Sequence, residues 1–179
     1  MRRVLVTGNA GAGKTTVAQL LAAQISLTYI GLDSIVWKPG WVKAPTSERR
    51  EKETAVANNQ AWVVDGVSLL ILRAADTVIF LDYPRYKCFW RVLRRNIPYL
   101  FRSRPGLPER CQEIRIIPTL IKTIWRFPHK VRPEILRECL TAGKFVVHIR
   151  SSGELKLFLS SFGTRPNNSV RDFPSTSGA

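Results

Sequence analysis

The sequence has few of the features that mark membrane, secreted or disulfide-rich proteins. It contains three cysteines in 179 residues, and their scattered positions at 88, 111 and 139 exclude a disulfide framework. No apolar run approaches the roughly 18 residues that a membrane span needs. Arg2 and Arg3 precede too short an apolar run for a signal peptide. We therefore expect a cytoplasmic protein with reduced cysteines and no membrane association.

Acidic residues are also scarce, and the resulting positive charge is concentrated in one segment. The chain has 13 Asp and Glu against 28 Lys and Arg, which gives a formal net charge of +15. Residues 85–137 contain 14 of the basic residues but three of the acidic ones. Such a segment attracts anions, for example a phosphorylated ligand, nucleic acid or a membrane surface.

Short apolar runs alternate with helical patterns, which is typical of βαβ units around a parallel sheet. We predict strands at 4–7, 28–32, 61–65, 77–81 and 144–149. We predict helices at 14–24, 47–59, 68–73, 85–95, 114–125, 133–141 and 151–162, with a loop at 35–45 and irregular chain through the rest of 96–132. The fold class is therefore α/β, with three layers and a mostly parallel five-stranded sheet. Residues 163–179 are polar and are expected to form a disordered tail.

The strongest motif is a phosphate-binding loop between the first strand and the first helix. Residues 8–15 read Gly-Asn-Ala-Gly-Ala-Gly-Lys-Thr and match G-x-x-x-x-G-K-[ST] at every fixed position. Glycines let consecutive backbone N–H groups face a phosphate, and the helix N-terminus adds its dipole. We expect Lys14 to reach the β- and γ-phosphates of ATP and Thr15 to hold Mg²⁺. The predicted nucleotide-binding residues are Gly8, Asn9, Ala10, Gly11, Ala12, Gly13, Lys14, Thr15 and Thr16.

Three aspartates follow predicted strands, where the ligand crevice of a parallel sheet lies. Asp65 precedes Gly66, which would let the backbone approach a ligand, so we predict that Asp65 is the carboxylate on the Mg²⁺ side. Asp82 is expected to anchor a loop. Asp33 follows the second strand, where a carboxylate can accept the proton of an acceptor hydroxyl; capping a turn is its structural alternative.

The basic segment has the place of a lid in small P-loop kinases. We predict a lid at about 96–132 and expect arginines near it, Arg91 and Arg95 among them, to stabilise the transferred phosphoryl group. These two arginines are four residues apart, hence on one helical face. Aromatic residues at 86, 89, 90, 99, 101, 125 and 127 interleave with the charges. At helical spacing they favour packing in the core or lid over stacking on nucleic acid.

With these residues in view, the chain resembles a small family of adenylate-kinase-like P-loop proteins labelled DNA topology modulation proteins. The resemblance covers about residues 2–162 and rests on the phosphate loop, on Leu32-Asp33 leading to Trp37-Lys38-Pro39-Gly40-Trp41, and on Val64-Asp65-Gly66. It implies one kinase-type domain with an ATP site. Relatives carry a polar stretch with an arginine after Asp-Gly; here that arginine is missing or is replaced by Arg73.

Two functions follow from these patterns. The first is a phosphotransferase that moves the γ-phosphoryl group of ATP to a small acceptor. The second is a nucleotide-dependent DNA-binding regulatory protein that uses the basic segment 85–137, for which salt-sensitive DNA affinity would be the mark. The absence of an Asn-Lys-x-Asp motif argues against a classical GTPase.

Overall fold

A five-stranded parallel sheet forms the centre of the molecule. The computed structural model describes residues 1–97, 113–141 and 143–163; the predicted tail and part of the predicted lid lie outside these residues. The sheet has the order β2-β5-β1-β6-β7, and all four of its strand pairs are parallel. Its strands are β1 (Arg3–Gly8), β2 (Tyr29–Gly31), β5 (Trp62–Asp65), β6 (Thr77–Leu81) and β7 (Phe145–Ile149). The predicted fold class and all five predicted strands are thus confirmed.

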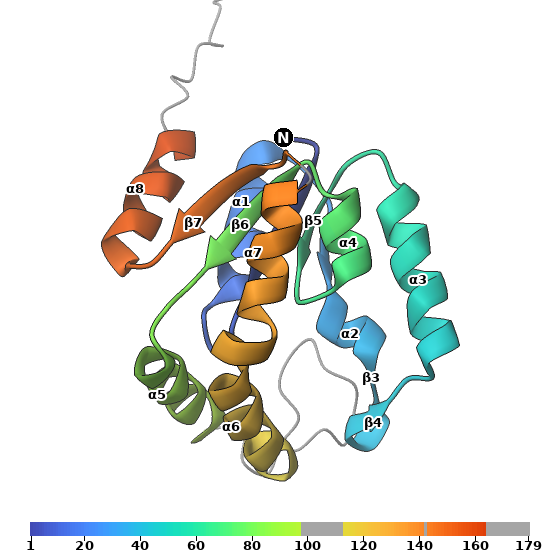
Figure 1. Cartoon of the computed structure of the whole chain (residues 1–179), viewed down its shortest axis with the longest axis vertical. Helices are drawn as coiled ribbons and strands as arrows, with labels where there is room; N and C mark the ends of the chain where they lie inside the picture. Colours follow the sequence, from blue (N-terminus) through green and yellow to red (C-terminus); the bar gives the residue numbers. More distant parts are fainter. Residues whose placement is uncertain (98–112, 142, 164–179) are drawn as a thin grey trace, which may run out of the picture.

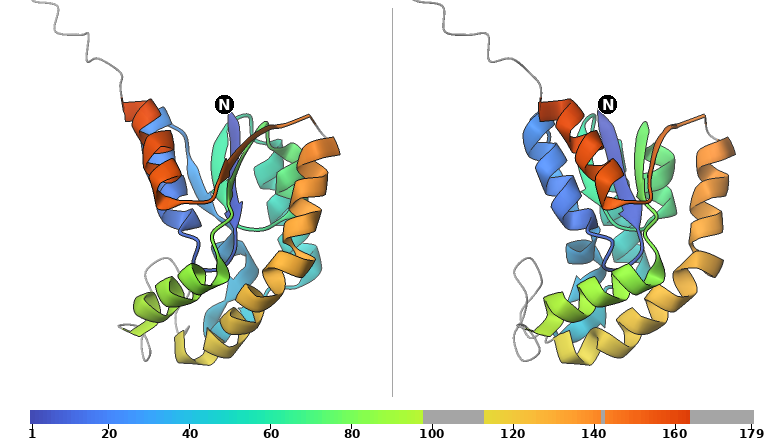
Figure 2. Two further views of the ribbon diagram at one scale, coloured as in Figure 1. Left: turned by 60° about the vertical axis from the view of Figure 1, so that its left-hand side comes forward. Right: turned by 90° about the vertical axis from the view of Figure 1, so that its left-hand side faces the viewer.

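Helices cover both faces of this sheet and produce the three predicted layers. Figures 1 and 2 show α1 and α8 on one face and α4 and α7 on the other, with α5 and α6 below the ends of the strands. The helices are α1 (Lys14–Ile25), α2 (Leu32–Val36), α3 (Thr46–Asn58), α4 (Leu69–Ala74), α5 (Arg85–Asn96), α6 (Glu113–Lys130), α7 (Arg132–Thr141) and α8 (Ser152–Gly163).

Alternating strand residues separate the core into two halves. Val4 and Val6 of β1 pack toward α1 and α8, whereas Leu5 packs toward α4 and α7. The same alternation in β6 sends Ile79 to one side and Phe80 to the other. Because successive strand side chains point to opposite faces, the fully apolar strands seen in the sequence are those buried on both sides.

Two predictions about local structure were wrong. Residues 35–45 do not form a loop throughout: after α2, the strands β3 (Trp37–Lys38) and β4 (Val42–Lys43) pair in an antiparallel hairpin around a 3₁₀ turn (Pro39–Trp41). The rings of Trp37 and Trp41 pack edge to face across this turn, with centroids 5.3 Å apart. The second error concerns α6, which continues past the predicted end at 125 and includes Pro118 and Pro128.

The basic helix α5 is only partly buried. Cys88 and Val92 face the core, whereas Leu93, next to Val92, is 38% exposed. The aromatic residues do not all pack as expected. Phe127 is buried, whereas Tyr86, Trp90 and Trp125 are 63%, 65% and 67% exposed. Among the described residues, no helix combines the length and apolar character needed to cross a membrane.

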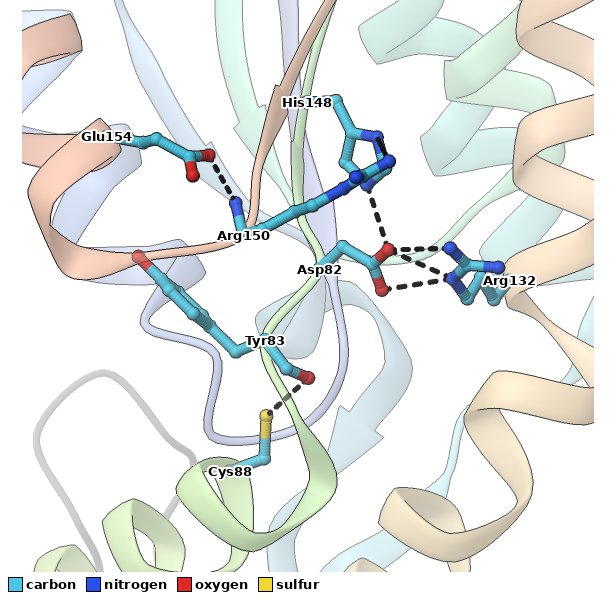
Figure 3. Close-up of polar contacts among 7 residues, drawn as sticks. All are labelled: Asp82, Tyr83, Cys88, Arg132, His148, Arg150 and Glu154. Atoms are coloured by element: carbon cyan, nitrogen blue, oxygen red, sulfur yellow. Dashed lines mark hydrogen bonds and ion pairs between the residues drawn. The ribbon is translucent and has the colours of Figure 1, made fainter.

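Asp82 joins three elements just beyond the end of β6. Figure 3 shows its carboxylate between His148 of β7 and Arg132 at the start of α7. Arg132 Nε donates to Asp82 Oδ1 at 3.1 Å and its Nη2 donates to Oδ2 at 2.9 Å, while His148 Nε2 lies 2.8 Å from Oδ2. This arrangement agrees with the expectation that Asp82 anchors local structure.

Acidification is expected to weaken this junction. Partial burial raises the pKa of Asp82, but hydrogen bonds from Arg132 and His148 outweigh burial and hold the pKa below its usual value. A carboxyl group with a depressed folded-state pKa stabilises the fold above its unfolded pKa of about 3.9, and this stability is lost as the pH falls through the folded value. We expect Asp82→Asn to lower the free energy of unfolding by about 1–3 kcal/mol at pH 7.

The pH dependence of that loss provides the check. Urea unfolding of the wild type and of Asp82→Asn should give curves whose difference begins to shrink below about pH 4 and continues to shrink as the pH falls through the folded value. A difference that stays constant from pH 7 to pH 3 would contradict a stabilising role for the ionised carboxylate.

Candidate functional site

The phosphate loop lies between β1 and α1 and packs directly on α5. Gly11 has a φ of +78°, in the left-handed region that glycine adopts readily. A Cβ at this position would contact the backbone carbonyl of Cys88 and lie 2.7 Å from Val92 Cγ2. Glycine at 11 is therefore required both by backbone conformation and by the close approach of α5. The motif from Gly8 to Thr15 has the strand-loop-helix context that its sequence predicted.

Lys14 sits where several charged groups meet. Its Nζ donates to the carbonyl of Asn9, across the loop, at 3.0 Å. Burial lowers the pKa of Lys14, while the charges of Asp33 and Asp65 raise it and that of Arg95 lowers it further. Lys14 is thus within electrostatic reach of both predicted carboxylates and of one predicted arginine, so the fold brings these four residues together.

Thr15 and Asp65 form the second part of the site. Thr15 Oγ1 donates to Asp65 Oδ2 at 2.7 Å. Asp65 ends β5 and Thr15 lies in the first turn of α1, so the parallel pairing of β1 with β5 places them together. Burial raises the pKa of Asp65, although hydrogen bonds from Thr15 and Tyr29 oppose that rise. A hydroxyl and a carboxylate oxygen are ligands suited to Mg²⁺, which keeps waters and binds substrate phosphates as well.

Tyr29 is a site residue that sequence reasoning missed. Its hydroxyl donates to the other oxygen of the same carboxylate, Asp65 Oδ1, at 2.9 Å. Burial and the negative charge of Asp65 raise the pKa of Tyr29, which keeps its proton for this bond. No sequence pattern pointed to this role, because a tyrosine in a short strand ordinarily indicates packing. The contact depends on the register that places β2 beside β5.

Glycine at 66 is required by the packing of the protein itself. Gly66 has a φ of +145°, and a Cβ there would lie 2.7 Å from Leu32 Cβ. Leu32 is a buried residue at the start of α2. Gly66 therefore lets α2 approach the end of β5 closely, which positions the neighbouring Asp33. Close approach of a ligand to this backbone stays a prediction.

The two predicted arginines lie in different surroundings. Arg91 stacks on the ring of Tyr83 at 4.5 Å, and its Nη1 donates to the carbonyl of Ala12 at 3.1 Å. Arg91 thus supports the outside of the phosphate loop. The charge of Arg95 lowers the pKa of Lys14. Arg73, the alternative acceptor-side arginine, pairs with Glu138 of α7 at 3.0 Å.

Asp33 is exposed in the first turn of α2, at the carboxyl end of β2. Its charge raises the pKa of both Lys14 and Asp65. The described residues contain no group of three or more His, Cys, Asp or Glu side chains able to hold a metal by themselves. The site as a whole combines the glycine-rich loop, the Lys14 ammonium, the hydrogen-bonded pair of Thr15 and Asp65, and the exposed Asp33 carboxylate at the carboxyl ends of the strands.

Comparison with solved structures shows the same fold in known kinases. Shikimate kinase from Acinetobacter baumannii in complex with shikimate is similar over 96% of this chain and 96% of its own, with 18% identity and a TM-score of 0.54. Shikimate kinase from Bacteroides thetaiotaomicron is similar over 89% of this chain and 95% of its own, with 14% identity and a TM-score of 0.52. No protein-family model and no curated protein matches the sequence. These similarities do not support the DNA topology resemblance or a nucleic-acid partner.

Proposed function

We propose that the protein is an ATP-dependent phosphotransferase that moves the γ-phosphoryl group of ATP to a hydroxyl group of a small acceptor. The observation that carries the proposal is the meeting of Lys14, Asp65 and Asp33 beside the phosphate loop. A nucleotide-binding protein without an acceptor would need the first two of these residues but not the third. Fold similarity to two shikimate kinases adds support at the level of architecture.

Each residue has a distinct part in this reaction. The N–H groups of the loop and the Lys14 ammonium bind the β- and γ-phosphates and offset the charge that spreads over the transferred group. Thr15 and Asp65 would hold Mg²⁺, directly or through water, which supplies further positive charge at the phosphate oxygens. Asp33 orients the acceptor hydroxyl and accepts its proton. Arg95 stabilises charge from the side of α5.

Replacing Asp33 with asparagine tests the proposal. ATP consumption with Mg²⁺ is measured against shikimate, other sugar acids, sugars, nucleosides, nucleoside monophosphates and plasmid DNA. We expect one small hydroxyl compound to stimulate turnover, and Asp33→Asn to reduce kcat by about 100-fold with little change in ATP affinity, because the proton acceptor is lost. Ser34→Ala, next in the chain, is the matched control and should retain activity.

Two other results would contradict all or part of this proposal. Stimulation by DNA alone, falling steeply with salt, would contradict the proposed phosphotransferase. Equal stimulation of wild type and Asp33→Asn by a small acceptor would keep the phosphotransfer but remove Asp33 from it.

A further inference from the structure

An apolar cavity is lined by residues of both α5 and α6, and of the phosphate loop it includes Asn9. Its volume is about 830 Å³, and its apolar walls include Tyr86, Phe89, Trp90, Ile121, Ile124 and Trp125. Figure 2 shows the two helices lying below the sheet. Lys14, Asp33 and Asp65 do not line it. A concave, mainly aromatic cavity of this size is typical of a small-molecule site.

The cavity continues into an exposed apolar face of α5. The apolar side chains at 86, 90, 93 and 97 follow helical spacing, and each is at least 38% exposed. Trp125 of α6 is also exposed, on the other side of the cavity. Exposed apolar surface grouped in this way, rather than scattered singly, indicates a binding surface.

The cavity contains a positively charged group, Arg85, that could bind an anion. Helix α5 contains no acidic residue. Arg85 lies over the Trp125 ring at 4.6 Å, so it bridges α5 and α6 at the cavity. No carboxylate in the described part of the chain lies within ion-pair distance of Arg85. Asp82, the one acidic residue among the described residues of the lining, is already bonded to Arg132 and His148. Arg85 is therefore the group available to an anion.

One hydrogen bond connects the cavity with the phosphate loop. Pro128 has no N–H, so the carbonyl of Ile124, four residues earlier, lacks its helical partner. Asn9 Nδ2 donates to this carbonyl at 3.1 Å, and Asn9 Oδ1 accepts the N–H of Ala10 at 2.8 Å. Asn9, Ile124 and Pro128 all line the cavity. A molecule in the cavity would thus touch the junction that holds the loop against α6.

We propose that this cavity binds a small amphiphilic anion, with its apolar body between α5 and α6 and its anionic group at Arg85. Through Asn9, the bound molecule changes the affinity of the phosphate loop for nucleotide. The binding half of the proposal stands on the cavity alone, whereas the coupling half rests on nucleotide binding in the proposed function.

The binding half is tested with two fluorescent probes. The full chain is titrated with anionic 8-anilinonaphthalene-1-sulfonate and with uncharged N-phenyl-1-naphthylamine. We expect saturable binding of one molecule of each. Arg85→Gln should weaken the anionic probe about tenfold and leave the uncharged one nearly unchanged, because a charged hydrogen bond is lost. Ile121→Trp, which fills the cavity, should weaken both.

Control variants and a second measurement decide between occupants. Leu140→Ala removes a side chain that is 84% exposed on α7 outside the cavity, and it should alter neither probe. Circular dichroism and thermal unfolding confirm that each variant folds. Probe affinities unchanged by both Arg85→Gln and Ile121→Trp would overturn the proposal. So would sedimentation showing a dimer that Ile121→Trp dissociates, because the cavity would then belong to an interface between two copies.

The coupling half is tested by calorimetric titration with Mg²⁺-ATP, with and without saturating anionic probe. We expect the probe to change the ATP dissociation constant severalfold and ATP to change probe affinity by the same factor, as linkage requires. Asn9→Ala should reduce this factor toward one. If the saturating probe leaves the ATP dissociation constant unchanged, the coupling is overturned. A wild-type chain that binds no ATP would overturn both the coupling and the proposed function, and the probe titrations would still decide the cavity.

Discussion

Lys14→Ala is expected to abolish phosphotransfer almost completely, with a fall in kcat on the order of 1,000-fold or more. Positioned cations that meet the charge of the transferred phosphoryl group contribute rate factors of about this size. Lys14 bridges the loop through the carbonyl of Asn9 at 3.0 Å and lies close to Arg95 and two carboxylates. Alanine removes the one cation that the loop itself supplies. The measurement is single-turnover transfer from labelled ATP to the acceptor identified in the panel.

A matched lysine separates this effect from the loss of general positive charge. Lys156 is exposed on α8, away from the loop, and Lys156→Ala removes the same charge from a chain whose net charge is already +15. We expect full activity from that variant. If the Lys14→Ala variant folds normally and still transfers phosphate within tenfold of the wild-type rate, the role given to the loop is contradicted.

Asp65→Asn is expected to have the second-largest effect, on the order of 1,000-fold in kcat, because a correctly held metal contributes several kcal/mol to the transition state. Thr15 and Tyr29 donate to different oxygens of Asp65, and in asparagine one of these oxygens is replaced by an NH2 group that cannot accept a hydrogen bond. It also lacks the charge that attracts Mg²⁺. We expect the Mg²⁺ concentration for half-maximal activity to rise, while metal-free nucleotide still binds within a few-fold of wild type.

The pH profile gives an independent check on Asp65. Burial raises the pKa of this carboxyl group, so its ionised form is lost at a higher pH than that of an ordinary aspartate, whose pKa is about 3.9. Activity and Mg²⁺ affinity should therefore fall together on the acid side. The control is Asp76→Asn at the opposite end of the sheet, where Asp76 accepts the N–H groups of Arg2 and Arg3. That variant should lose stability and keep its Mg²⁺ dependence.

The candidate site was predictable from the sequence where local patterns carry the chemistry. The phosphate loop has a contiguous motif, and the position of Asp65 at the end of an apolar strand follows from counting residues. Tyr29 could not be found in this way, because its bond to Asp65 depends on which strand lies beside β5. The sequence also could not predict that Arg91 bonds to the Ala12 carbonyl while the charge of Arg95 acts on Lys14. Residues four apart share a helix face but do not have the same neighbours.

The end of α6 could not be predicted from the positions of its prolines alone. Proline removes a helical hydrogen bond and leaves a carbonyl without its partner, so the sequence favoured an end before Pro128. In the fold the freed carbonyl of Ile124 accepts the side chain of Asn9, 115 residues away in sequence. The lost local bond is thus replaced by a tertiary one. This compensation joins the phosphate loop to the helix that follows the basic segment.

The sequence by itself determined the parallel α/β architecture and the nucleotide loop, because strand alternation, helix spacing and the loop motif are all set by neighbouring residues. Tertiary structure decided which distant groups meet. It placed Thr15 and Tyr29 within hydrogen-bond distance of Asp65 and Arg132 within hydrogen-bond distance of Asp82. It also formed an apolar cavity beside Arg85. The physical reason is that hydrogen bonds, ion pairs and cavities depend on separations of a few ångströms between elements, and these separations follow from sheet order and helix packing.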